Sequence, residues 1–282
     1  MRIDSPTNPR IKAALRAVES GERVLLEGPR AIGEALAAGI VPREIFLEGK
    51  EGKGGAEVVR EAVERGASLC FVSSKVLRKL SDLPSARGVV ALAIPPRRSL
   101  QDLYPSENPP SVPLSRFSSS PSFSPSSSSL SSSSLFVLLD GIQDPANVGA
   151  IVRSAEAFGA TGVLLTPDCA SPFSPKAVRA SALSALRVPL ATGVRPKDAA
   201  AWAARNGAAL AGAEAHGGGP PDALAKVRPL VLVIGSEGRG ISPELERNLT
   251  TRVTLRLADR VESLNAAVAA GLLLYLATRR EV

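Results

Sequence analysis

The stretch DGIQDPANVGAIVRS, residues 140–154, contains the most informative strand-to-helix transition of the chain. It starts at the end of a predicted apolar strand, 136–140, crosses a polar turn and enters a predicted helix that runs from Asn147 to Phe158. Asparagine is a good helix N-cap, and a helix N-terminus offers free N–H groups to anions. Gly149 and Arg153 share one helix face, and arginine suits forked hydrogen bonds to phosphate. The pattern indicates a candidate anion site, and a capped surface helix with a solvated arginine is the alternative.

A second segment, VLVIGSEGRG at residues 231–240, joins a predicted buried strand, 230–234, to a loop rich in glycine. Such a loop lets a backbone approach a ligand closely. It matches neither the GxGxxG dinucleotide pattern nor the GK[ST] phosphate loop. Glu237, between two glycines, is placed for a site, although an ordinary strand-to-helix turn also explains the pattern.

In a third segment, TLRLADRVESLN at residues 254–265, a predicted short strand, 253–257, leads to Ser263 and Asn265, which stand directly before an apolar helix, 266–278. Ser263 and Asn265 are natural helix caps, so a purely structural role is open. Each of the three segments follows a strand, and parallel α/β sheets bind ligands at the carboxyl ends of their strands. We therefore expect the three segments to form one pocket. The helix is apolar almost all round, which places it inside a knot or a subunit interface.

A Ser/Pro-rich stretch divides the 282-residue chain. Residues 105–134 contain sixteen serines and six prolines and are predicted to be a flexible linker between domains 1–104 and 135–282. The first domain is predicted as a small α/β sandwich with helices 11–19, 29–38 and 56–65 and strands 24–26, 44–47, 69–72 and 89–93. The second is predicted as an α/β domain with a parallel sheet, with further strands 162–165 and 208–213 and a further helix 175–186.

Composition narrows the function. The net charge of +7 permits an anionic partner. One histidine and two distant cysteines, Cys70 and Cys169, exclude an imidazole triad, a multi-histidine metal site and a CxxC redox pair within one chain. The longest apolar run, 266–276, falls short of the ~20 residues that span a bilayer, and the first residues lack the apolar core of a signal peptide. We expect no metal, no membrane partner and a cytoplasmic location.

Taken together, and in this order, the three segments resemble the signature motifs of the SpoU (TrmH-type) RNA 2′-O-ribose methyltransferases. The N-x-G-x-I-x-R motif falls on Asn147, Gly149, Ile151 and Arg153. The G-x-E-x-x-G motif falls on Gly235, Glu237 and Gly240, and the S-L-N motif on Ser263, Leu264 and Asn265. Residues 5–12 and 26–36 are similar to the ribosomal-protein-like substrate-binding domain that precedes the catalytic domain in many members.

The resemblance implies a deep trefoil knot of the SPOUT type, an obligate homodimer and S-adenosylmethionine as cofactor. It implies cofactor contacts from Gly235, Gly240, Leu255 and Leu264. It implies a catalytic group of Arg153, Asn147, Glu237, Ser263 and Asn265, in which Arg153 grips phosphate and stabilises developing negative charge. The implied reaction is 2′-O-methylation of structured RNA, with ribosomal RNA favoured over transfer RNA because of the front domain.

The chain departs from the family at residues 255–259, where Ile-Pro-Met/Ile-x-Gly is expected and Leu-Arg-Leu-Ala-Asp stands. Three other readings stay open: a transfer-RNA ribose methyltransferase, a non-catalytic ribosome-assembly module of the same fold and a nucleotide-dependent oxidoreductase. In the front domain the candidate phosphate contacts are Arg10, Lys12, Arg16, Arg30, Lys75, Arg78 and Lys79.

Overall fold

The computed structural model describes residues 2–49, 55–81, 88–103 and 134–279. All but the last residue of the expected linker, 105–134, lies outside the described residues. The chain divides into two compact units. One comprises Met1–Pro96 and Phe173–Arg179, and the other Arg97–Pro172 and Ala180–Val282. Among the described helices, none combines the length and the apolar character needed to cross a membrane.

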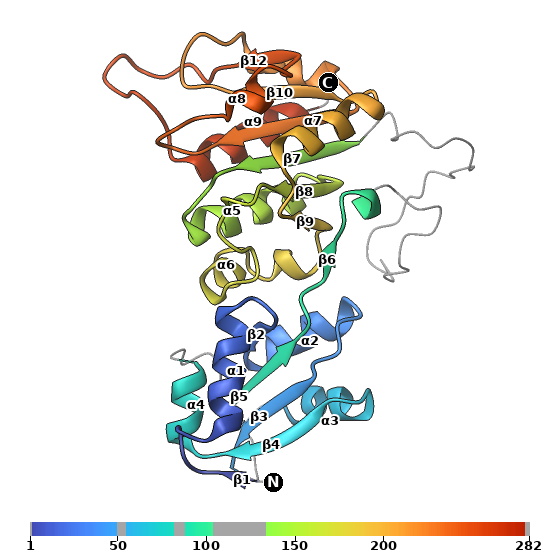
Figure 1. The fold of residues 1–282 in the computed structure, drawn as a ribbon, viewed down its shortest axis with the longest axis vertical. Coiled ribbons are helices and arrows are strands. Elements are labelled where there is room, and N and C mark those ends of the chain that lie inside the picture. The colour runs from blue at the N-terminus through green and yellow to red at the C-terminus, as the bar shows by residue number, and fades with distance from the viewer. Residues whose placement is uncertain (1, 50–54, 82–87, 104–133, 280–282) are drawn as a thin grey trace, which may run out of the picture. The chain divides into compact units, whose positions relative to one another are not determined.

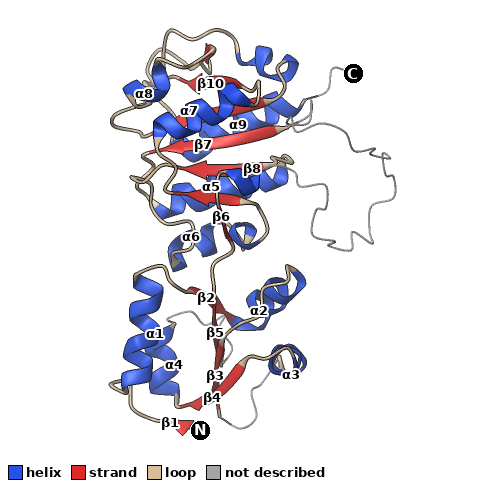
Figure 2. Cartoon of the chain, turned by 45° about the vertical axis from the view of Figure 1, so that its right-hand side comes forward, coloured by secondary structure: helices blue, strands red, loops and turns tan. Residues whose placement is uncertain are grey.

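The first unit is an α/β sandwich around a five-stranded mixed sheet of order β1-β4-β3-β5-β2 (Figure 1). The strands are β1 (Arg2–Ile3), β2 (Val24–Glu27), β3 (Glu44–Glu48), β4 (Ser68–Val72) and β5 (Val89–Ala93). Helices α1 (Pro9–Glu19) and α4 (Ser74–Leu80) cover one face, and α2 (Gly28–Ala37) and α3 (Ala56–Glu64) cover the other (Figure 2). Phe46, Cys70 and Val90 are fully buried between the sheet and α1 and α4. The predicted α/β sandwich is confirmed.

The second unit contains a seven-stranded sheet of order β12-β10-β11-β7-β8-β9-β6, in which every neighbouring pair is parallel. The predicted parallel sheet is therefore confirmed. Its strands are β6 (Arg97–Arg98), β7 (Leu135–Asp140), β8 (Gly162–Leu165), β9 (Leu190–Thr192), β10 (Ala209–Ala213), β11 (Leu230–Gly235) and β12 (Thr251–Val253). All six residues of β7 are buried, as expected of a central parallel strand.

Helices pack around this sheet. They are α5 (Pro145–Ala157), α7 (Pro196–Arg205), α8 (Pro243–Glu246) and α9 (Ala266–Thr278), with 3₁₀ segments η2 (Gln101–Leu103), η3 (Ser184–Leu186) and η4 (Pro221–Lys226). Helix α6 (Pro175–Ala180) lies almost wholly in the segment that belongs to the first unit. Trp202 of α7 packs edge-on against Phe136 of β7, with ring centroids 5.0 Å apart. The apolar helix α9 contacts α5 and β11. It has the predicted bounds.

Helix α1 begins at Pro9 rather than at residue 11, and within residues 134–279 three predicted elements have boundaries that are wrong by two residues or more. Helix α5 begins at Pro145, not at Asn147, because the side chain of Asp144 caps it by accepting from the Ala146 N–H at 3.0 Å and proline at the first position presets φ. The predicted helix 175–186 ends at Ala180, since Ala182 and Leu183 have φ of 47° and 70°.

The third wrong boundary concerns the strand predicted at 253–257. The observed strand, β12, is Thr251–Val253, and its ladder with β10 ends where Val253 pairs with Ala213. Residues 254–265 therefore form a long loop between β12 and α9. That loop carries the third of the segments that the sequence analysis selected.

Candidate active site

The carboxyl ends of the two central strands meet at one edge of the parallel sheet. Gly235, the last residue of β11, is in register with Asp140, the last residue of β7. The buried carboxylate of Asp140 accepts a hydrogen bond of 2.6 Å from the Ser242 N–H, which ties the end of β7 to the segment after the glycine loop. Two of the three selected segments are thereby adjacent.

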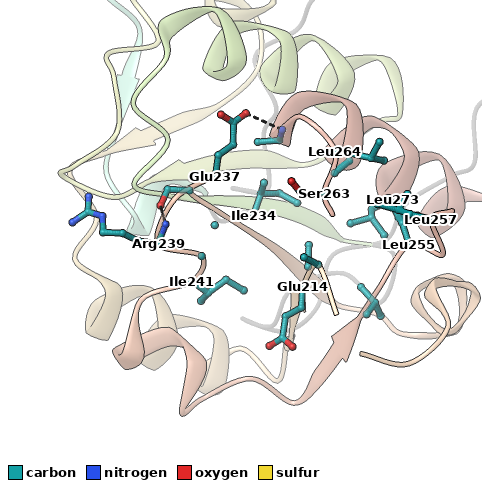
Figure 3. A pocket seen from close by; sticks show the side chains of 18 of the residues that line it. Glu214, Ile234, Glu237, Arg239, Ile241, Leu255, Leu257, Ser263, Leu264 and Leu273 are labelled. Carbon is teal, nitrogen blue, oxygen red and sulfur yellow. Dashed lines mark hydrogen bonds between the residues drawn. The ribbon is translucent and has the colours of Figure 1, made fainter. Parts of the chain in front are cut away.

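The glycine loop folds back onto its own strand. The Ser236 N–H donates to the Gly240 carbonyl at 3.1 Å, and the Gly240 N–H donates to the Ser236 carbonyl at 2.8 Å. A Cβ atom added at Gly235 would lie 2.4 Å from the carbonyl carbon of Gly240, so this position requires glycine. The tight closure turns Glu237 toward the N-terminus of α9 (Figure 3).

One carboxylate oxygen joins all three segments. Oε1 of Glu237 accepts hydrogen bonds from Asn147 Nδ2 at 3.0 Å, from Asn265 Nδ2 at 3.1 Å and from the Ala266 N–H at 3.2 Å. Asn265 Nδ2 also lies 3.0 Å from Asn147 Oδ1. We call these three residues the Asn–Glu–Asn cluster. The structure brings together residues that come from α5, the glycine loop and the start of α9.

Asn265 has two roles in this arrangement. Its Oδ1 accepts from the N–H groups of Ala267 and Val268, at 3.0 and 3.3 Å, and so caps α9. Its Nδ2 belongs to the cluster. The two explanations weighed from the sequence, cap and site, are therefore compatible, because the oxygen serves the helix and the nitrogen serves the cluster.

A cavity of about 440 Å³ lies beside the cluster, within the usual size range of ligand pockets (Figure 3). Its apolar wall comes from Ile234, Leu255, Leu257, Leu264 and Leu273. Its polar lining includes Glu214, Ser236, Glu237, Arg239 and Ser263. All four residues expected to contact the cofactor, Gly235, Gly240, Leu255 and Leu264, line this cavity.

A second, smaller cavity of about 220 Å³ adjoins the first. It is lined by the turn after β7 and the start of α5, with Gln143, Asp144 and Asn147 as its polar side chains on that side. The two cavities share Ser236, Glu237, Arg239 and Ala266. The glycine loop and the first residue of α9 thus lie between the two cavities.

Arg153 lies outside both cavities. It is exposed on α5, two residues before the buried Ala155, and it makes no hydrogen bond or ion pair with the part of the chain that the structure describes. Ser154, its neighbour, lies beside Gly271 of α9: a Cβ atom built there would be 3.5 Å from the Ser154 hydroxyl. The structure therefore does not join Arg153 to the cluster within one chain.

Charged residues that line the cavities but were not predicted from the sequence include Arg239 and Glu214. Arg239 lines both cavities and belongs to the glycine loop, so its position two residues after Glu237 could have identified it as a site residue. Glu214 follows β10 and lines the larger cavity, where Arg252 Nε pairs with its carboxylate at 2.7 Å. Glu214, like the three segments, directly follows a strand. Its ion pair with Arg252, however, forms only because β10 pairs with β12, and that pairing is not evident from the sequence.

A thiol supports the turn after β7. Cys169 donates a hydrogen bond of 3.2 Å to the carbonyl of Leu139, and burial raises the pKa of its thiol, which favours the protonated donor form. The nearby Gly141 N–H donates to the Thr166 hydroxyl at 3.0 Å. These contacts hold the turn that lines the smaller cavity.

Comparison with known proteins gives a consistent result for both units. The family described as SpoU rRNA Methylase matches residues 134–275, and the MRM3-like substrate binding domain matches residues 8–91. A protein of Mycobacterium avium described as an uncharacterized tRNA/rRNA methyltransferase is 33% identical over 282 residues, which cover 99% of this chain and 82% of that protein.

Solved structures agree. The AdoMet-bound rRNA methyltransferase from Sinorhizobium meliloti is 25% identical with a TM-score of 0.80, and the match covers 98% of this chain and 97% of that one. A crystal structure of an RNA 2′-O ribose methyltransferase is 27% identical with a TM-score of 0.71, and the match covers 98% of each chain.

Proposed function

Because the chain belongs to the SpoU family of RNA methyltransferases, we propose that it methylates the 2′-hydroxyl of a ribose in structured RNA, with ribosomal RNA as the preferred substrate. The family uses S-adenosylmethionine. The observation that carries the proposal is the Asn–Glu–Asn cluster between two adjoining cavities, the larger of which has an apolar wall of leucines. The 2′-O assignment is supported by the motifs and by the related 2′-O ribose methyltransferase. The rRNA preference is supported by the related rRNA methyltransferase.

The larger cavity would hold the cofactor. Leucines at 255, 257, 264 and 273 offer an apolar wall to an adenine ring, and the closed glycine loop offers backbone groups. Arg256 and Asp259, where the chain departs from the family pattern, are exposed and line neither cavity, whereas Leu255 and Leu257 of the same stretch do. When bound, S-adenosylmethionine supplies an electrophilic methyl group on a sulfonium.

The smaller cavity would hold the target ribose. Glu237 Oε1 is saturated by three donors, and within the described residues Oε2 accepts no hydrogen bond. Oε2 can therefore accept from the 2′-hydroxyl and orient that oxygen toward the larger cavity. Asn147 holds Glu237 in place and lines the same cavity. Ser263 lines the larger cavity and would help to position the cofactor there.

Two arginines would handle negative charge. Arg239 lines both cavities and would bind a phosphate of the target nucleotide. Arg153 would stabilise charge that develops on the ribose oxygen, a role that leaves its own proton in place because arginine is not deprotonated in proteins. Since Arg153 lies outside its own chain's cavities, we propose that it acts on the site of a second subunit.

A second subunit would also cover the exposed apolar side chains of α9. Val268, Leu272 and Tyr275 are 52%, 45% and 52% exposed and form one stripe on α9, whose opposite side is buried. The stripe adjoins α5, because Phe158 and Tyr275 are in ring contact at 6.0 Å and Ser154 faces Gly271. A homodimer formed through this surface would cover the stripe and carry Arg153 to the partner subunit.

Four expectations remain predictions: a threaded trefoil knot in the second unit, the division of labour between a substrate-binding unit and a catalytic unit, a metal-free reaction and a cytoplasmic location. The likeness of residues 8–91 to the MRM3-like substrate binding domain supports the division of labour.

The test of the proposal is methyl transfer by the purified protein. Ribosomal RNA and transfer RNA without prior modification are incubated separately with S-adenosylmethionine carrying a tritiated methyl group. We expect label in ribosomal RNA at a rate well above that in transfer RNA. Label confined to transfer RNA would overturn the preferred substrate, and cofactor binding without transfer to any RNA would favour the assembly module.

A further inference from the structure

The two helical faces of the first unit differ in charge. On the face of α2 and α3, each arginine has a carboxylate four residues away on its own helix. The pairs are Arg30 with Glu34, Arg60 with Glu64 and Arg65 with Glu61. Pairing of this kind leaves the α2–α3 face close to neutral.

The face of α1 and α4 is basic. These two helices lie side by side on the other side of the sheet (Figure 2). Their exposed cations are Lys12, Arg16, Lys75, Arg78 and Lys79, and we call this surface the α1–α4 basic face. The only acidic residue of the two helices is Glu19, at the end of α1. In the ranges that the structure describes, none of the five cations forms an ion pair.

The spacing aligns the cations. Lys12 and Arg16 are four residues apart, and Lys75 is followed by Arg78 and Lys79 at three and four residues, so each helix presents its charges on one side. Arg10, although also on α1, is directed to the sheet, where its Nη2 pairs with Glu44 at 2.9 Å. The structure thereby separates the candidate phosphate contacts into an aligned group of five and the paired Arg10 and Arg30.

The side chains on the α1–α4 basic face indicate which kind of partner it binds. Neither α1 nor α4 contains an aromatic residue, and neither exposes a large apolar side chain. Protein interfaces are enriched in aromatic anchors and poor in lysine, and single-stranded nucleic acid is held by stacking on aromatic rings. A lysine- and arginine-rich surface without such anchors suits the regularly spaced phosphates of a nucleic acid duplex.

We propose that the α1–α4 basic face binds the phosphate backbone of a double-helical RNA segment, without reading its sequence. The inference deepens the proposed function and rests on it for the identity of the polyanion. It assigns the grip on the substrate to one face of the first unit, away from the α2–α3 face.

The test compares charge-neutralised variants of the full chain. In the principal variant all five cations become glutamine, a good helix former that keeps the side-chain length. A smaller variant, Arg16→Gln with Arg78→Gln, guards against misfolding of the first. Its matched control is Arg60→Gln with Arg65→Gln, which removes two exposed arginines from the opposite face. The probe is a fluorescent RNA hairpin of mixed sequence, titrated at several salt concentrations, and thermal melting checks folding.

We expect the five-site variant to bind the hairpin at least about tenfold more weakly, with a plot of log affinity against log salt that becomes shallower by about 0.9 for each lost phosphate contact. The two-site variant should lose part of this, and the control should match the wild type. Two hairpins of unrelated sequence should respond alike. Equal affinity and salt slope in the two-site variant and the control, with both proteins folded, would overturn the proposal.

The outcome is separable from the test of methyl transfer. If the wild type binds the hairpin, the five-site variant does not, and the wild type transfers no methyl group to any RNA, then the proposed role of the basic face is supported and the proposed enzyme activity is wrong. If methyl transfer proceeds and RNA affinity is insensitive to the five substitutions, the enzyme proposal stands and the basic face falls. If an acidic protein competes better than RNA for the wild type, the assignment to RNA is wrong.

Discussion

The carboxamide nitrogen of Asn147 donates a 3.0 Å hydrogen bond to Oε1 of Glu237, although 90 residues separate them in the chain. The bond links the first turn of α5 to the glycine loop after β11, across the edge where the two strands end. The same oxygen receives the backbone N–H of Ala266 and the side chain of Asn265. Glu237 is therefore the point at which the three segments are joined.

Replacement of Glu237 by alanine should separate function from folding. Asn147 and Asn265 are near enough to solvent to bond water instead, so we expect unfolding to become easier by only about 1–2 kcal/mol. Methyl transfer should fall at least about 100-fold, because nothing would then orient the ribose hydroxyl. Thermal denaturation and a methyl-transfer assay measure the two effects. An Ala variant that keeps its full rate would remove Glu237 from the site.

Two glycines of the loop make a matched pair. In Gly235→Ala the new methyl group would lie 2.4–2.6 Å from backbone atoms of Gly240 and Ile241, so the loop must open. Overpacking of this kind costs about 1–3 kcal/mol. We expect at least about tenfold weaker binding of S-adenosylmethionine by calorimetry. Gly238→Ala, where no atom lies within 4 Å of the added carbon, should bind like the wild type. Equal binding by the two variants would mean that the loop does not shape the proposed cofactor site.

The apolar stripe on α9 predicts a dimer that a single charge can break. Leu272 is 45% exposed, and Leu272→Asp should convert the protein from dimer to monomer in sedimentation velocity, because a buried unpaired charge is unfavourable. Val63→Asp on α3, where the side chain is 39% exposed, is the control and should remain dimeric. A wild type that sediments as a monomer would contradict the dimer directly.

Much of this architecture was predictable where the signals are local. The apolar runs of β7 and β11 and the cap-plus-apolar pattern of α9 define elements without reference to distant residues, and α9 has the predicted bounds. The start of α5 was misassigned although its signal was local too: Asp144 followed by Pro145 is a stronger start than Asn147. Short strands such as β6 and β9 could not be predicted, because two or three residues become a strand only by pairing with a distant neighbour.

The candidate site also has features that the sequence predicts and features that it does not. That polar residues after strands converge follows from a parallel sheet, and Asn147, Glu237 and Asn265 do converge. Whether a side chain faces the cavity depends on packing that motifs do not encode. Arg153 and Asn147 belong to one motif, yet Asn147 lines a cavity and Arg153 does not.

Mixing two inactive proteins tests whether Arg153 serves the partner subunit. Arg153→Ala and Glu237→Gln should each be inactive alone. If each site takes Arg153 from one subunit and Glu237 from the other, each mixed dimer contains one intact site out of two. Random exchange makes about half of the dimers mixed, so activity should return to roughly a quarter of the wild-type level. Failure to regain activity, with exchange verified by tagged subunits, would place Arg153 and Glu237 of each site in the same chain.

The chemical position of the transferred methyl group decides whether the protein is a ribose 2′-O-methyltransferase. A 2′-O-methyl group blocks the attack of that oxygen on the adjacent phosphorus, so the neighbouring phosphodiester bond survives alkali. RNA labelled by the purified protein with tritiated methyl groups is hydrolysed in alkali and the products are separated by size. We predict that the label elutes in alkali-resistant dinucleotides. Label in mononucleotides, the mark of a methylated base, would contradict the account.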